Sequence, residues 1–96
     1  MKIKLIKALT KSFLEMMLSN IRTSDRKRVE GSQWGAVGLV QAKLIDLYWA
    51  ADIAEKASTV RTVLVMGNCP QHIQMLAIFG KQMAVSTALD KIQESR

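Results

Sequence analysis

The chain has 96 residues, and 49% of them are hydrophobic, which excludes a compositionally disordered protein and fits one domain spanning residues 1–96. Its 14 Lys and Arg residues outnumber 8 Asp and Glu residues, which gives a formal net charge of +6. This basic balance is compatible with nucleic acid, an anionic membrane or an acidic protein as a partner, and it excludes none of the three.

Residues 2–21 carry the pattern of an amphipathic helix. Lysine side chains and Glu15 fall on the face opposite an apolar stripe. The stripe repeats at alternating spacings of three and four residues: Ile6, Leu9, Phe13, Met16 and Asn20. Residues 22–32, the most polar stretch of the chain, are predicted to form a loop or a frayed helix.

Residues 33–51 are also predicted to be helical, with Ser32 as the N-cap. One apolar row consists of Val37, Val40, Leu44, Leu47 and Ala51, and a second contains Ile45 and Tyr48. Five of the residues from 59 to 65 are β-branched, which favours a strand in isolation. A lone strand in an otherwise helical chain would have no pairing partner, so residues 52–66 are predicted to be helical as well.

Residues 70–95 form the last predicted helix. From Met75 to Leu89 the chain contains a single charge, Lys81, and every helical face carries apolar or small side chains. A helix that is apolar all round must be covered all round. A chain of this length has little surface with which to cover it, so we expect a second chain to complete the burial. The predicted layout is four to six short helices and no sheet.

Catalytic and metal-binding machinery is missing from the sequence. His72 is the single histidine and Cys69 the single cysteine, and no orienting carboxylate lies near this pair, as a nucleophile and base would require. One His and one Cys are too few for a zinc site. We therefore predict no enzymatic activity, no metal and no cofactor. No apolar run approaches the roughly 18 residues of a membrane span, and we expect an intracellular, cytoplasmic protein.

One dense basic cluster is present: Arg22, Arg26, Lys27 and Arg28. Several cations within one turn are able to follow a nucleic-acid backbone. A solvated loop, neutralised in part by Asp25 and Glu30, explains the cluster equally simply, and no aromatic side chains interleave with it for base stacking. We favour the solvated loop.

The segment 70–92 resembles the last helix pair of the YscG-type chaperones of type III secretion, which are small tetratricopeptide-like helical proteins. The similar elements are Pro70, Leu76-Ala77, Ala84-Val85-Ser86 and Ala88-Leu89-Asp90. Upstream, Ala51-Asp52-Ile53 stands where such repeats often carry Gly-Asp-Tyr at a helix turn. The resemblance implies an all-α fold, a tetratricopeptide-like array of antiparallel helix hairpins.

The same resemblance implies a function. Such chaperones pair with a small helical co-chaperone and hold the secretion needle subunit in the cytoplasm by burying its amphipathic helix, a helix-in-groove mode of recognition. The apolar side chains predicted to bind the partner are Leu9, Phe13, Met16, Leu44, Leu47, Tyr48, Met75, Phe79 and Met83. Two alternatives stay open: a small basic regulator that binds nucleic acid through residues 22–28, and a homo-oligomeric structural bundle.

Overall fold

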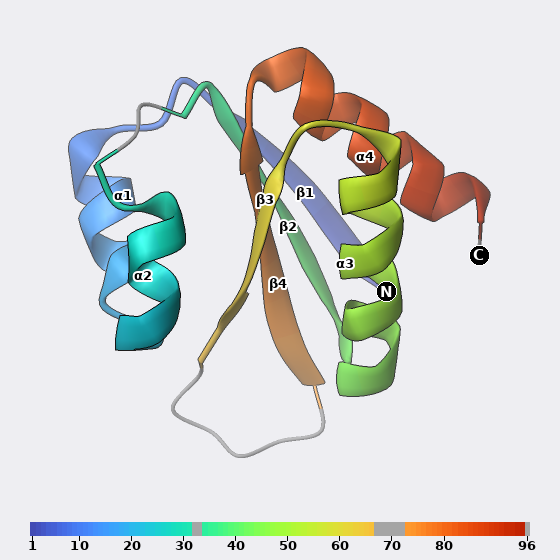
Figure 1. The fold of residues 1–96 in the computed structure, drawn as a ribbon, viewed down its shortest axis with the longest axis horizontal. Coiled ribbons are helices and arrows are strands. Elements are labelled where there is room, and N and C mark those ends of the chain that lie inside the picture. The colour runs from blue at the N-terminus through green and yellow to red at the C-terminus, as the bar shows by residue number, and fades with distance from the viewer. Residues whose placement is uncertain (32–33, 67–72, 96) are drawn as a thin grey trace.

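The computed structural model describes residues 1–31, 34–66 and 73–95, and it contains a sheet as well as helices (Figure 1). Its elements in chain order are β1 (Lys2–Lys7), α1 (Lys11–Leu18), α2 (Thr23–Val29), β2 (Ala36–Lys43), α3 (Leu44–Ala57), β3 (Arg61–Val65), β4 (Ile73–Gly80) and α4 (Gln82–Glu94). The fold is therefore mixed α/β, and the prediction of an all-α, tetratricopeptide-like array of helix hairpins is wrong.

The four strands form one antiparallel sheet in the order β1-β2-β4-β3. The register is continuous across it: Leu5 lies opposite Gly38, Gly38 opposite Ile78, and Ile78 opposite Thr62. Helices α1 and α2 lie on one side of the sheet, and α3 and α4 lie on the other (Figure 1). Both faces of the central strands are therefore covered by the chain itself.

The predicted helix over residues 2–21 is correct only in its second half. Residues 2–7 form β1, in which Ile3 and Leu5 point to one face of the sheet and Ile6 to the other. The chain then turns at Ala8, which has a positive φ of 53°. Helix α1 begins after Thr10, whose side-chain oxygen accepts a hydrogen bond from the Phe13 N–H at 3.1 Å. The polar stretch that follows, predicted as a loop or a frayed helix, contains the short helix α2.

The predicted helix over residues 33–51 is wrong up to Lys43, because residues 36–43 form the central strand β2. A strand covered on both faces reads as a near-continuous apolar run, and such a run can mimic helical spacing. The expectation for residues 52–66 also fails after Ala57, since residues 61–65 form β3. The β-branched residues do have a pairing partner, which is β4.

The apolar segment that was expected to need a second chain is divided between β4 and α4. Leu76, Ala77, Ile78 and Phe79 are each at most 2% exposed, because alternate side chains enter the two cores on opposite faces of the sheet. Gly80 ends β4, and α4 begins two residues later. The chain itself therefore covers the strand part of this segment, whereas Met83 on α4 remains 83% exposed.

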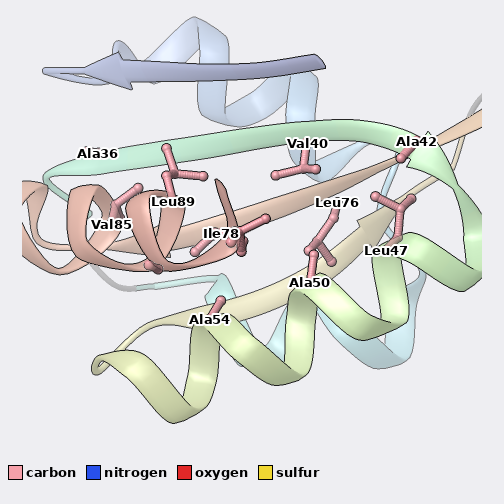
Figure 2. Close-up of a cluster of buried hydrophobic side chains, with 12 residues drawn as sticks. Ala36, Val40, Ala42, Leu47, Ala50, Ala54, Leu76, Ile78, Val85 and Leu89 are labelled. Carbon is pink, nitrogen blue, oxygen red and sulfur yellow. The ribbon is translucent and has the colours of Figure 1, made fainter. Parts of the chain in front are cut away.

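The larger core lies between the sheet and helices α3 and α4. Figure 2 shows side chains of β2 and β4 pointing toward those of the two helices, with Leu76 and Ile78 at the centre. Helix α4 packs closely on β2 because Gly38 has no side chain. A Cβ at this position would lie 2.9 Å from Leu89 Cδ2. The buried members are Ala36, Val40, Ala42, Leu47, Ala50, Ala54, Leu76, Ile78, Val85, Ala88, Leu89 and Ile92.

The second core lies between the opposite face of the sheet and helices α1 and α2. Phe79 is buried here, and its ring centroid is 5.8 Å from that of Trp34. The indole Nε1 of Trp34 donates a hydrogen bond to the Val29 carbonyl at 2.8 Å, which ties the end of α2 to this core. The other buried members are Met17, Ile21, Val29, Val37, Val63 and Ala77.

The molecule is a slab of about 32 × 32 × 20 Å. Figure 1 looks along the shortest of these axes and shows β3 in front and the paler β1 behind. The four strands are therefore arranged one behind another along the 20 Å axis, so that the edge strands β1 and β3 lie on the two broad faces of the slab. Over residues 1–31, 34–66 and 73–95, no helix combines the length and apolar character that crossing a lipid bilayer requires.

Candidate interaction surfaces

The predicted partner-binding residues are dispersed over the fold. Leu47 and Phe79 lie in the two different cores, on opposite faces of the sheet, so they do not converge on one groove. Three of the others are half-buried: Leu9, Phe13 and Met75. The remaining four are exposed: Met16, Leu44, Tyr48 and Met83. The structure therefore does not form the concave groove expected from the sequence.

Helix α3 presents two exposed ridges because its core-facing stripe is narrow. Leu47, Ala50 and Ala54 are fully buried against the sheet. One ridge, Ile45 and Trp49, is 76% and 38% exposed, and it borders a hollow of about 550 Å³ next to Met1 and Ser95. We call this ridge, together with its neighbour Leu44, the α3 apolar surface. Exposed apolar patches of this kind commonly mark contact sites between proteins.

The other ridge of α3 faces the outer edge of β3. Tyr48 and Ala51 line a second hollow, of about 310 Å³, between α3 and α2. Arg22, Asp25 and Arg28 line it from the α2 side, and Thr62, Val63, Leu64 and Leu76 line it from the sheet. We call this hollow the β3-edge hollow.

A polar bridge spans the β3-edge hollow. The Arg28 Nη2 lies 3.5 Å from the Glu55 Oε2, and the Thr62 hydroxyl donates a hydrogen bond to the same carboxylate oxygen. Arg28 belongs to α2 and Glu55 to α3, so the bridge connects helices from opposite sides of the sheet over the edge strand between them. Both charged side chains are close to half-exposed.

Sequence reasoning placed Ile45 in an apolar row but missed the exposed Trp49 and the pair formed by Glu55 and the buried Thr62. The missing information was the start of α3 at Leu44, which determines which residues of the helix face the sheet. With the helix starting there, Leu47, Ala50 and Ala54 face the sheet and are fully buried, and Ile45 and Trp49 are left outside.

The residues weighed for catalysis, Cys69 and His72, lie outside the described residues, as does the predicted N-cap Ser32. Within the described part of the chain, no group of three or more His, Cys, Asp and Glu side chains is placed to hold a metal ion.

The chain matches no protein-family model and no curated protein sequence. Solved structures do match it, and two of them are microcompartment shell proteins. One is the ligand-free GrpU microcompartment shell protein of Pectobacterium wasabiae, at 34% identity and a TM-score of 0.79, covering 96% of this chain and 99% of that one. The other is the ligand-free GrpU shell protein of Clostridiales bacterium 1_7_47FAA, at 27% identity and a TM-score of 0.71, covering 99% of this chain and 94% of that one. The chain therefore belongs to the microcompartment shell proteins, and among them to the GrpU family.

This family membership corrects the functional prediction. The chain is not a YscG-type type III secretion chaperone, and a co-chaperone and a needle subunit are the wrong partners. The alternative of a nucleic-acid-binding regulator gains no support either. The sequence similarity to that family did not reflect a shared fold. Leu76-Ala77 lies in the strand β4, whereas in a tetratricopeptide-like array it would lie in a helix.

Proposed function

We propose that this protein is a structural, non-catalytic subunit of a bacterial microcompartment shell in the cytoplasm, and that it builds the shell by associating with further shell-protein copies. The observation that carries this proposal is the likeness to a GrpU shell protein at 34% identity over 96% of the chain. Residues 1–96 would act together as one building block.

The shape of the molecule supports a single-layer arrangement. The slab is 20 Å thick and 32 Å across in both other directions. The strand edges on its broad faces are basic: β1 contributes Lys2, Lys4 and Lys7, and β3 contributes Arg61 beside the arginines of α2. Natural proteins use charged residues on edge strands to prevent edge-to-edge pairing, and like charges repel across paired strands. Copies are thus expected to join through their sides, not through their broad faces.

Apolar side chains are available for such contacts. The α3 apolar surface exposes Ile45 and Trp49, and Met16 and Met83 are 62% and 83% exposed on α1 and α4. Of the partner-binding residues predicted from the sequence, we retain Met16, Leu44 and Met83 as contacts between copies. Methionine is suited to this role because its flexible thioether adapts to irregular apolar surfaces.

The test is the assembly state of the purified protein. We expect light scattering and electron microscopy to show particles far larger than the 10.7 kDa chain. The double substitution Ile45→Asp and Trp49→Asp should reduce assembly strongly, because it places charges in an apolar contact. Gln93→Asp, an exposed change on α4, is the matched control and should assemble normally. A wild-type protein that stays monomeric at high concentration, alone and with other shell proteins, would contradict the proposal.

A further inference from the structure

The outer edge of β3 carries backbone groups that no strand of the described chain pairs with. Met66, just after β3, donates its N–H to the Asn20 carbonyl at 2.7 Å, away from β4. Backbone groups alternate in direction along a strand. Thr62 and Leu64 therefore point their N–H and C=O groups outward in the same way. Both of these residues line the β3-edge hollow.

The hollow lies beside β3 and is lined by Thr62, Val63 and Leu64 of that strand. Helix α2 borders it on one side and α3 on the other, with β3 between them (Figure 1). Its volume of about 310 Å³ is at the lower end of the range of roughly 300–1,000 Å³ that is typical of ligand sites. Main-chain pairing with an exposed sheet edge is an established mode of peptide recognition, in which alternate side chains provide specificity.

The two walls of the hollow differ in chemistry. The α2 wall carries Arg22 and Arg28, against one acidic lining residue in the described chain, Asp25. The α3 wall and the adjoining sheet are mostly apolar, with Tyr48, Ala51 and Leu64. Successive side chains of an added strand would face these two walls alternately. The matching sequence pattern is thus acidic, apolar, acidic, apolar.

The ion pair of Arg28 and Glu55 across the hollow is weak enough for such a ligand to displace it. The Arg28–Glu55 contact is 3.5 Å long and half-exposed, and exposed ion pairs contribute only about 0–1 kcal/mol. A ligand carboxylate would be able to replace Glu55 as the partner of Arg28, because a planar guanidinium donates two parallel hydrogen bonds to a carboxylate. Glu55 would keep its bond from the Thr62 hydroxyl.

A strand of a second copy is a poor occupant. Another copy offers two edge strands: β1, whose exposed side chains include Lys2, Lys4 and Lys7, and β3, which begins at the exposed Arg61. These cations would meet the arginines of α2. Charge complementarity therefore points to an acidic partner.

We propose that the β3 edge binds an extended segment of a partner protein with alternating acidic and apolar residues, as a fifth strand paired with Thr62 and Leu64. Its carboxylates contact Arg22 and Arg28, and its apolar side chains contact Tyr48 and Ala51. Peptide binding does not depend on shell assembly. If the protein does form a single layer, the site lies on one of its broad faces and stays accessible there.

The test uses a fluorescein-labelled peptide of four Glu-Val repeats and measures its anisotropy as the protein is added. We expect saturable binding, slowed amide hydrogen exchange at Thr62 and Leu64, and a roughly tenfold loss of affinity in Arg28→Ser, because this substitution removes the charged hydrogen-bond donor that meets the peptide carboxylate. Lys27→Ser is the matched control, because Lys27 is a cation of the same helix that does not line the hollow. It should bind the peptide nearly as the wild type does.

A second peptide separates strand pairing from plain charge attraction. N-methylation of alternate amides keeps every charge but removes the main-chain donors, so this peptide should not bind. Equal binding of the methylated peptide, equal loss of affinity in Lys27→Ser, or no binding at all would overturn the proposal. Concentration-dependent protection of Thr62 and Leu64 without peptide would make the edge an interface between copies and would also overturn it. Light scattering on the same samples reports shell assembly separately, so the two proposals fail independently.

Discussion

At the scale of single residues, the fold depends on side chains that are small enough or large enough for their positions between the layers. Gly38 lies at the centre of β2, where the packing of α4 leaves no room for a Cβ. Phe79 is the largest fully buried side chain, and it fills the core under α1 and α2. Both positions sit in the central strands, where each face has a tightly packed layer against it.

Gly38→Ala should destabilise the protein by about 1–3 kcal/mol, the usual effect of forcing an extra methyl group into a packed core. The added Cβ would meet Leu89 Cδ2 at 2.9 Å and Val85 Cγ1 at 3.1 Å. Urea unfolding followed by circular dichroism measures the change. Gly35→Ala is the control, because its nearest contact, at 3.4 Å, is ordinary. Similar effects of the two substitutions would show that α4 does not pack this closely on β2.

Phe79→Ala should lower the free energy of unfolding by about 3–5 kcal/mol, because it leaves a cavity under Trp34 and the α1–α2 layer. The same unfolding experiment tests this. Gln93→Ala, at an exposed position of α4 that is not proposed as a contact between copies, should change stability by less than about 0.5 kcal/mol. A stable Phe79→Ala protein would place this ring on a surface and not in the core.

At the scale of elements, the two helical layers are connected in two ways. One is the sheet itself, whose central strands contribute to both cores. The other is the bridge of Arg28, Glu55 and Thr62 over β3. Thr62 is 6% exposed, so its hydroxyl needs the Glu55 carboxylate as a partner, whereas Arg28 can be solvated without it.

Thr62→Val should therefore destabilise more than Arg28→Ala. Loss of the Thr62 hydrogen bond is expected to cost about 1–2 kcal/mol, and loss of the half-exposed ion pair less than about 1 kcal/mol. Thermal unfolding of the two single variants and the double variant measures both contributions and their coupling. The opposite order would mean that the ion pair is the dominant contact between α2 and α3.

At the scale of the whole molecule, the slab separates apolar surface from basic surface. The α3 apolar surface and the methionines of α1 and α4 are proposed to join copies, and the β3 edge is proposed to bind an acidic strand. These two kinds of contact differ in their response to salt, because dissolved ions screen exposed charges but do not weaken apolar burial.

Sodium sulfate should accordingly strengthen assembly of the copies and weaken binding of the acidic peptide. Assembly is measured by sedimentation velocity and peptide affinity by anisotropy, from about 0.01 to 0.5 M sodium sulfate, over which the Debye length falls from above to well below roughly 10 Å. Assembly that dissociates as salt rises would indicate that charge pairs, not apolar contacts, join the copies.

Local sequence patterns were sufficient for the helical residues of α1, α3 and α4, and they also identified the β-branched run that forms β3. Helical spacing and β-branching are properties of a few neighbouring residues, so one sequence displays them. Composition likewise excluded a disordered chain, because enough apolar residues are present to fill two cores.

Only the tertiary structure decided that residues 36–43 and 73–80 are strands. A central strand buried on both faces has no alternation of polar and apolar residues, so its sequence is indistinguishable from that of a buried helix. The identity of β3 depended on them in turn, since a strand forms only where another strand accepts its hydrogen bonds. The β3-edge hollow also depends on the tertiary structure, because Arg22, Tyr48 and Leu64 come together only when α2 and α3 lie on the two sides of the sheet.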